Sequence, residues 1–201
     1  MSKGRFIVVE GLDGSGKTTQ ARRLVSTLQA TGHLARFTAE PSGLPIGKLI
    51  RQALLDPTQL GEATLPYLFA ADRRDHLDRE ILPALARGEV LVCDHYVGSS
   101  LAYQSFSLPL EEVWSLNARF PAPDLTLFID LPLEDCAARV RARGAALERF
   151  EDMDRAASLA AAYGLSMATL QARGHKVVAV DGHGGADEVA ARVWAEVLRC
   201  L

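Results

Sequence analysis

The apolar residues of this chain form two patterns that alternate along its length. The first is a short, nearly continuous apolar run, which is typical of a parallel strand covered on both faces. Runs of this kind occur at residues 6–9, about 35–38, 90–93, 125–131 and 176–180. The second repeats apolar residues with helical spacing, as from Thr18 to Ala30. Strands that alternate with helices predict an open α/β sheet whose ligands bind at the carboxyl ends of the strands.

Residues that could bind a ligand or take part in catalysis follow three of the predicted strands. Gly11 follows the first strand, Glu40 the second and Asp94 the third. Because carboxyl ends of parallel strands meet at one edge, these positions are expected to lie near one ligand site. No repeat, linker or low-complexity segment divides the chain, so one domain over residues 1–201 is expected.

The segment from Glu62 to Arg87 predicts a long helix with two irregularities. Pro66 should bend or break this helix near its start, and Pro83 should disturb its last turn. The reason is that proline lacks the N–H that a helix interior needs, and its ring collides with the preceding turn.

Residues 11–18 match G-x-x-x-x-G-K-[ST], the phosphate-binding loop of nucleoside triphosphate enzymes. Glycine lets the backbone curl and point its N–H groups inward, and the helix that follows adds the positive end of its dipole. Lys17 would reach the β- and γ-phosphates, and Thr18 would offer its hydroxyl to Mg²⁺. The strand before and the helix after argue against a chance match. The expected ATP-binding residues are Gly11, Leu12, Asp13, Gly14, Ser15, Gly16, Lys17 and Thr18.

Composition and charge narrow the classes of protein. The net charge of −3 gives no basic field, which disfavours a protein that coats nucleic acid. No apolar run approaches the roughly 20 residues that cross a bilayer, and no signal-peptide pattern precedes the first strand, so a cytoplasmic protein without a membrane partner is expected. The spacing of Cys93, Cys136 and Cys200 fits neither a disulfide framework nor a zinc site, and Cys93 is expected in the core.

Asp94 ends a continuous apolar strand and is a second candidate for metal binding. In phosphate-loop enzymes an Asp at a strand end helps to hold Mg²⁺, directly or through water. The alternative is a helix cap or an ordinary loop carboxylate. Together with the glycine loop, Asp94 and Thr18 are the expected metal ligands.

Several further motifs follow one another in an order that indicates a family. After Asp94 come His95-Tyr96, the two serines at 99 and 100, and Ala102-Tyr103-Gln104. With the glycine loop, the other motifs are Glu40-Pro41, Ile50-Arg51, Leu68–Arg73, Pro123–Leu127 and an arginine-rich stretch at 139–149. In these motifs the chain resembles thymidylate kinases over most of its length.

The resemblance implies a fold and a reaction. The fold would be the three-layer type of phosphate-loop NTPases, a nucleoside monophosphate kinase domain with a five-stranded parallel sheet flanked by helices and a lid at about 139–151. The reaction would move the γ-phosphoryl group of ATP, with Mg²⁺, to the 5′-phosphate of dTMP, giving dTDP and ADP. A homodimer would form on packed helices, with the 62–87 and 97–118 regions as candidates.

On the donor side, the resemblance implies that Lys17 holds ATP and that lid arginines reach the transferred phosphate. The glycine loop itself has no arginine, so the chain matches the type in which the lid supplies it. Arg143 and Arg149 are the expected catalytic arginines, together with Lys17 and Asp13. At least one of Arg139, Arg141 and Arg143 is expected on a solvated helix face.

On the acceptor side, four residues would contact the base. Phe69 would stack on thymine, Arg73 would hydrogen-bond its edge, and Ser100 and Gln104 would also contact it. From the residues alone, a helical Phe69 could equally be core and Arg73 a surface residue.

Five residues would contact the sugar and the acceptor phosphate. Tyr103 would lie under the deoxyribose and disfavour a 2′-hydroxyl, and Glu40 would face the same side. Arg51 would meet the acceptor phosphate, unless it is a surface residue. Asp13 would lie near the 3′-hydroxyl and the acceptor phosphate, and His95 near that phosphate.

The chain departs from the family pattern near the acceptor phosphate. His95 stands where the family has arginine, whose two parallel hydrogen bonds histidine cannot reproduce. Ala39 and Ser42 replace a common Arg and Gly, and residues 105–109 lack the usual Gly and Arg. Glu148 replaces an Asp.

These departures leave two alternatives to a dTMP kinase. One is a related kinase that acts on another nucleotide or deoxynucleoside. The other is a nucleotide-binding regulator with weak turnover, against which the retained Lys17, Thr18, Asp94 and lid arginines argue.

Overall fold

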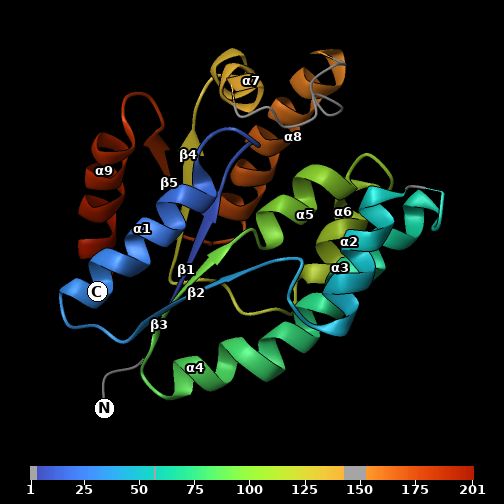
Figure 1. The fold of residues 1–201 in the computed structure, drawn as a ribbon. Helices are drawn as coiled ribbons and strands as arrows, with labels where there is room; N and C mark the ends of the chain where they lie inside the picture. Colours follow the sequence, from blue (N-terminus) through green and yellow to red (C-terminus); the bar gives the residue numbers. More distant parts are fainter. Residues whose placement is uncertain (1–3, 57, 143–152) are drawn as a thin grey trace.

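The computed structural model describes residues 4–56, 58–142 and 153–201. Its sheet has five strands in the order β2-β3-β1-β4-β5, and all neighbouring strands run parallel. The strands are β1 (Arg5–Glu10), β2 (Ala35–Ala39), β3 (Val90–Asp94), β4 (Leu125–Asp130) and β5 (Val177–Asp181). Each end lies within one residue of the predicted apolar run. The predicted α/β architecture is therefore confirmed (Figure 1).

Helices connect the strands and flank the sheet. They are α1 (Lys17–Ala30), α2 (Pro45–Leu55), α3 (Leu65–His76), α4 (Leu82–Ala86), α5 (Val97–Gln104), α6 (Leu110–Asn117), α7 (Leu133–Ala142), α8 (Met153–Ala172) and α9 (Ala186–Leu198). A 3₁₀ turn, η1 (Glu62–Thr64), precedes α3, and a π-helical segment, η2 (Leu77–Ile81), joins α3 to α4. None of the helices within the described residues is long and apolar enough to cross a membrane.

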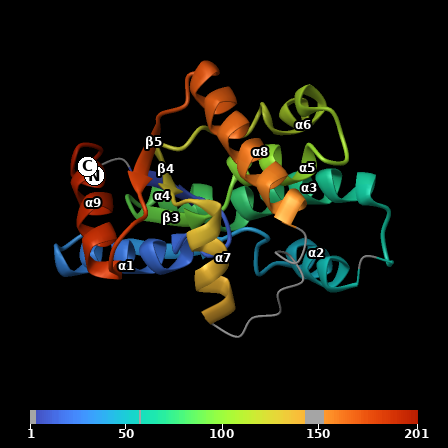
Figure 2. The ribbon, with the colours of Figure 1, turned by 90° about the horizontal axis from the view of Figure 1, so that it is seen from above.

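The sheet separates two hydrophobic cores, because successive side chains of a strand point to opposite faces. On β1, Phe6 and Val8 pack with η2, α5 and α8, whereas Ile7 and Val9 pack with α1 and α9. Figures 1 and 2 show α1 and α9 together on one side of the strands and α5 and α8 on the other. Cys93 lies in the hydrophobic core that contains Phe6 and Val8, and its predicted core position is confirmed.

The segment predicted as one long helix, Glu62 to Arg87, is interrupted near both of its prolines, as predicted. The 3₁₀ turn η1 gives way to α3 directly before Pro66, which stands in the first turn of α3, where its missing N–H costs no helical hydrogen bond. The second irregularity is the π turn of η2, which ends two residues before Pro83 at the start of α4. A wider turn there gives room for a proline that cannot donate to the preceding turn.

The parallel register brings the three strand ends together, as predicted. Val9 and Ala39 both lie beside Asp94 in the ladder. The N–H of Glu40 donates to the carbonyl of Asp94 at 3.0 Å, and that of His95 donates to Val9 at 3.1 Å. The glycine loop, Glu40 and Asp94 therefore share one edge of the sheet.

Candidate active site

The glycine loop turns β1 into α1. Gly14 and Gly16 have φ values of 89° and 95°, in the left-handed region that favours glycine. A Cβ on Gly14 would lie 2.3 Å from the carbonyl oxygen of Cys136, so α7 approaches the loop to backbone contact. The Lys17 side chain is buried, and its ammonium lies 2.7 Å from Oδ1 of Asp13. The loop thus holds a cation at the N-terminus of α1, where phosphates bind.

Thr18 and Asp94 meet beside this loop. The Thr18 hydroxyl donates to Oδ2 of Asp94. Oδ1 of Asp94 is buried and has no hydrogen-bond partner in the described part of the chain. Those described residues also contain no group of three or more His, Cys, Asp and Glu side chains suited to a metal. One carboxylate with one hydroxyl fits Mg²⁺, which is usually completed by substrate phosphates and water.

A cavity of about 470 Å³ adjoins the glycine loop. Leu12 and Asp13 of the loop line one part of it. Most of the residues predicted for the acceptor line the rest, namely Glu40, Phe69, Arg73, His95, Ser100, Tyr103 and Gln104. Oε1 of Gln104 is buried with no hydrogen-bond partner among the described residues, as expected of a group that meets a ligand. Segments far apart in the sequence therefore form one concave site.

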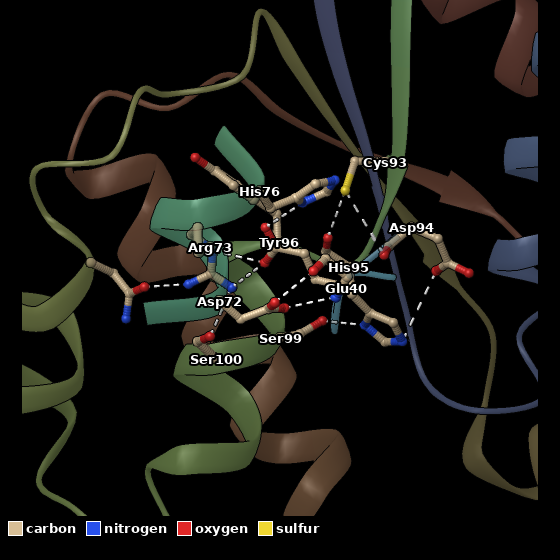
Figure 3. A network of polar contacts seen from close by, with 12 residues as sticks. Glu40, Asp72, Arg73, His76, Cys93, Asp94, His95, Tyr96, Ser99 and Ser100 are labelled. Carbon is tan, nitrogen blue, oxygen red and sulfur yellow. Dashed lines mark hydrogen bonds and ion pairs between the residues drawn. The ribbon is translucent and has the colours of Figure 1, made fainter. Parts of the chain in front are cut away.

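Arg73 is fully buried in this cavity wall (Figure 3). Its guanidinium pairs with Oε2 of Glu40, at 2.8 Å from Nε and 2.7 Å from Nη2. Nη2 also donates to the Ser100 hydroxyl at 3.0 Å, and Nη1 donates to Oδ1 of Asn117. The Tyr96 ring lies 4.8 Å from its central carbon. Arg73 is thus a fixed cation rather than a surface residue.

His95 lines the cavity with a strained backbone. Its φ of 68° is left-handed, which is uncommon for any residue other than glycine. Nδ1 contacts the Ser99 hydroxyl and lies 3.6 Å from Oε2 of Glu10, while Nε2 lies 4.0 Å from Oδ1 of Asp94 (Figure 3). One ring nitrogen is therefore held by the protein, and the other faces the predicted metal ligand.

Glu10 is a buried residue behind the cavity that the sequence analysis missed, and it holds the cavity residue Ser99. It is fully buried at the end of β1, and its Oε1 accepts the N–H groups of Tyr96 at 2.9 Å and Ser99 at 3.1 Å. Burial alone would raise the pKa of this carboxyl, but the neighbouring His95, Ser99 and Tyr96 outweigh burial and hold the pKa below its usual value. The sequence did contain a signal for Glu10, because a carboxylate that ends an apolar strand directly before a glycine loop is unusual and indicates a buried polar contact.

Arg51 is the predicted acceptor residue that the described cavity lining does not include. Its guanidinium donates to the carbonyl oxygens of Pro41 and Ser42, at 2.6 Å for Ser42. Asp72 holds the same loop from α3, accepting the N–H of Ser42 at 2.7 Å and its hydroxyl at 2.6 Å. In this arrangement Arg51 braces the loop that carries Glu40.

Arg143 and Arg149 lie outside the described residues. Of the neighbouring arginines, Arg141 is exposed, as predicted for at least one of the group. Arg139 donates from Nη1 to the carbonyl of Ser15 at 3.2 Å and from Nη2 to that of Gly182 at 3.1 Å. It therefore joins α7 to the glycine loop and to the segment after β5.

Comparisons with known proteins identify the family of this chain. The thymidylate kinase family model matches residues 9–191. A thymidylate kinase of Ruegeria pomeroyi is 41% identical over 205 residues, which cover 98% of this chain and 96% of the relative. One of Synechococcus is 39% identical over 197 residues, covering 96% and 93%. A probable thymidylate kinase of Pyrococcus horikoshii is 42% identical over 152 residues, covering 73% and 74%.

Proposed function

The chain belongs to the thymidylate kinase family, and we propose that it transfers the γ-phosphoryl group of ATP to the 5′-phosphate of dTMP, giving dTDP and ADP. The cavity is the observation that supports this most directly. Leu12 and Asp13 of the phosphate loop line the same cavity as the acceptor residues, so a donor on the loop and an acceptor in the cavity would meet. Phosphoryl transfer needs mainly such positioning together with charge neutralisation.

The donor side rests on the glycine loop. The loop N–H groups and the N-terminus of α1 bind the ATP phosphates, and Lys17 exchanges its contact with Asp13 for the β- and γ-phosphates. Thr18 and Asp94 hold Mg²⁺, which when bound neutralises charge on the phosphates.

The acceptor side rests on α3, α5 and the loop after β2. Phe69 stacks on thymine, while Arg73, Ser100 and Gln104 contact its edge. Tyr103 and Glu40 face the deoxyribose, and its 3′-hydroxyl lies near Asp13. His95 supplies the polar group for the acceptor phosphate that an arginine supplies elsewhere in the family, and Arg51 assists from the loop that it braces.

The remaining charge stabilisation comes from a lid at about residues 139–151, within a single domain of residues 1–201. Arg143 and Arg149 are its proposed catalytic residues. A lid arginine that contacts the phosphate only in the reacting state lowers the barrier without tightening ground-state binding.

A turnover assay with ATP, Mg²⁺ and a panel of acceptors tests this function. dTMP should be turned over most efficiently. dUMP should be modestly worse, because it lacks one buried methyl group. UMP and CMP should be worst, because Tyr103 would collide with their 2′-hydroxyl. Equal turnover of UMP or CMP would favour a kinase for another nucleotide. Turnover of thymidine alone would favour a deoxynucleoside kinase, and no turnover of any acceptor would favour a regulator.

The same proposal includes a homodimer in the cytoplasm. Tyr67 of α3 and Phe106, which follows α5 and also lines the cavity, are aromatic side chains that are about half exposed, at 49% and 56%, in the two regions expected to pair. Sedimentation of the purified protein should give twice the mass of the chain. A Tyr67→Glu, Phe106→Glu variant should sediment at the mass of one chain.

A further inference from the structure

A buried histidine lies behind the acceptor cavity, and the proposed mechanism does not use it. His76, at the end of α3, is fully buried and is not among the described residues that line the cavity. Its Nδ1 lies 3.2 Å from Oε1 of Glu40, and its Nε2 lies 2.7 Å from the Thr38 hydroxyl on β2. Figure 3 shows the His76 ring beside Glu40 and Arg73.

The direction of the contact with Glu40 follows from the chemistry of the two groups. An ionised carboxylate paired with a guanidinium can only accept hydrogen bonds. Nδ1 of His76 therefore carries a proton and donates it to Oε1, whether or not Nε2 is protonated.

The hydrogen bond from His76 fixes the Glu40 carboxylate, and this carboxylate in turn holds Arg73. Oε1 of Glu40 is engaged by His76, and Oε2 is engaged by Nε and Nη2 of Arg73. Loss of the His76 donor would leave a buried carboxylate oxygen without a partner, which is costly unless the side chain turns. If Glu40 turned, the Arg73 guanidinium would lose its contacts at Nε and Nη2 and would be held only by Ser100, Asn117 and the Tyr96 ring, so its direction would be less well fixed.

The direction of this guanidinium decides which base it can read. Within the described residues, Nη1 donates to Asn117 and has a second N–H for which no acceptor is present. Thymine presents a carbonyl where cytosine presents an amino group, so an N–H fixed in the cavity accepts thymine and rejects cytosine. A guanidinium free to turn would discriminate less.

We propose that His76 is a positioning residue for acceptor recognition, because its Nδ1–H fixes Glu40 and Glu40 fixes the guanidinium of Arg73 against the base. This inference rests on the proposed function, since it takes the thymine base as the ligand of Arg73.

Two amide variants of the full chain separate the two ring nitrogens. The amide nitrogen of His76→Asn falls near the place of Nδ1 and keeps the donor to Glu40, whereas that of His76→Gln falls near Nε2 and loses it. In His76→Gln, KM for dTMP should rise roughly tenfold, and the preference for dTMP over dCMP should fall by a similar factor. KM for ATP should stay unchanged and kcat should stay within about threefold. In His76→Asn, all these values should stay within about twofold of the parent.

Three results would overturn the proposal: equal effects of the two variants, an unchanged KM for dTMP in folded His76→Gln, or a parallel rise in KM for ATP. Thermal unfolding checks that both variants are folded. If His76→Gln does not fold, His76→Asn decides alone, because a large rise in its KM for dTMP refutes the role of Nδ1. A parent that does not phosphorylate dTMP refutes the proposed function itself, whereas an active parent with an unaffected His76→Gln refutes only the role of His76.

Discussion

Three buried carboxylates at the ends of neighbouring strands differ in their partners, and these differences assign them different roles. Glu10 accepts backbone N–H groups at the start of α5, and Glu40 pairs with Arg73 and His76. Asp94 has a hydroxyl on one oxygen, whereas its other oxygen accepts no hydrogen bond within the described residues and lies 4.0 Å from Nε2 of His95. Because a buried carboxylate oxygen without a hydrogen bond is costly, Asp94 is the carboxylate that gains most from a bound cation, whereas Glu10 and Glu40 already accept hydrogen bonds on both oxygens.

Substitution of Glu10 should reveal its structural role through pH. Glu10→Gln keeps the shape of the side chain but removes the charge that His95, Ser99 and Tyr96 stabilise, so the unfolding free energy at pH 7 should fall by about 2 kcal/mol. The folded pKa of Glu10 lies below its usual value, so its stabilisation is complete above the unfolded pKa and is lost as the pH falls through the folded one.

Urea unfolding of parent and variant between pH 7 and pH 3 measures this difference directly. The gap should narrow only below the ordinary carboxyl pKa of 4.5. A gap of constant size over the whole range would mean that packing, rather than the charge of Glu10, stabilises the fold.

His95 should limit affinity for the acceptor phosphate. Arginine at this position can form two parallel hydrogen bonds to a phosphate, which an imidazole with Nδ1 already held by Ser99 cannot do. His95→Arg should therefore lower KM for dTMP by roughly tenfold and leave KM for ATP unchanged. Initial rates against both substrates provide the measurement, and a KM for dTMP that does not fall would remove His95 from the phosphate site.

Among the elements, α7 contacts the glycine loop backbone to backbone. Gly14 and Gly32 have nearly equal φ values, 89° and 87°, but a Cβ on Gly14 meets the Cys136 carbonyl whereas one on Gly32 meets no atom within 4 Å. Gly32→Ala should therefore cost only the left-handed backbone term of about 1 kcal/mol. Gly14→Ala should cost more than this and should also raise KM for ATP, because α7 or the loop must move.

Urea unfolding and ATP kinetics of the two alanine variants test this contact. The shared backbone strain makes Gly32→Ala the matched control. Equal losses of stability in both variants, with unchanged KM for ATP, would show that α7 does not constrain the loop.

The elements also show which structural features could be predicted from the sequence. The five strands could be located because each is buried on both faces and therefore reads as one continuous apolar run. The two irregularities in the segment from 62 to 87 were predicted at Pro66 and Pro83, but their form was not, because the two prolines carry the same local signal whereas one follows a 3₁₀ turn and the other a π turn. A proline in the first turn of a helix is harmless, and only the fold shows where that turn lies.

For the molecule as a whole, the sequence predicted which motif residues lie near the cavity. It did not predict which other residues hydrogen-bond to them and fix their positions. The glycine loop and Asp94 stand at the ends of strands, and most of the residues that the motifs proposed for the acceptor line one cavity. Glu10, His76 and Asn117 have partners far away in the sequence, so only the folded chain brings them to Ser99, Glu40 and Arg73. Lone polar residues in apolar segments give no indication of their partners.

The proposed function assigns the two substrates to different elements, and this assignment is testable without turnover. Lys17 and Thr18 stand at the start of α1, whereas Phe69 and Arg73 belong to α3. Phe69 is only partly buried and lines the cavity, so its truncation should cost little stability. A ligand that binds only the native state stabilises it by about 2.7 kcal/mol at 100 times its Kd, which raises Tm.

Phe69→Ala should therefore reduce the rise in Tm caused by dTMP and leave that caused by ATP with Mg²⁺ intact, while Lys17→Ala should do the reverse. The expected loss for dTMP is about 1 kcal/mol or more, because base stacking on the ring disappears. Thermal unfolding of parent and both variants, with each ligand at a fixed concentration, measures both shifts. If each variant weakened both shifts equally, the donor and acceptor sites would have to share these residues, and the assignment of Phe69 to thymine would fail.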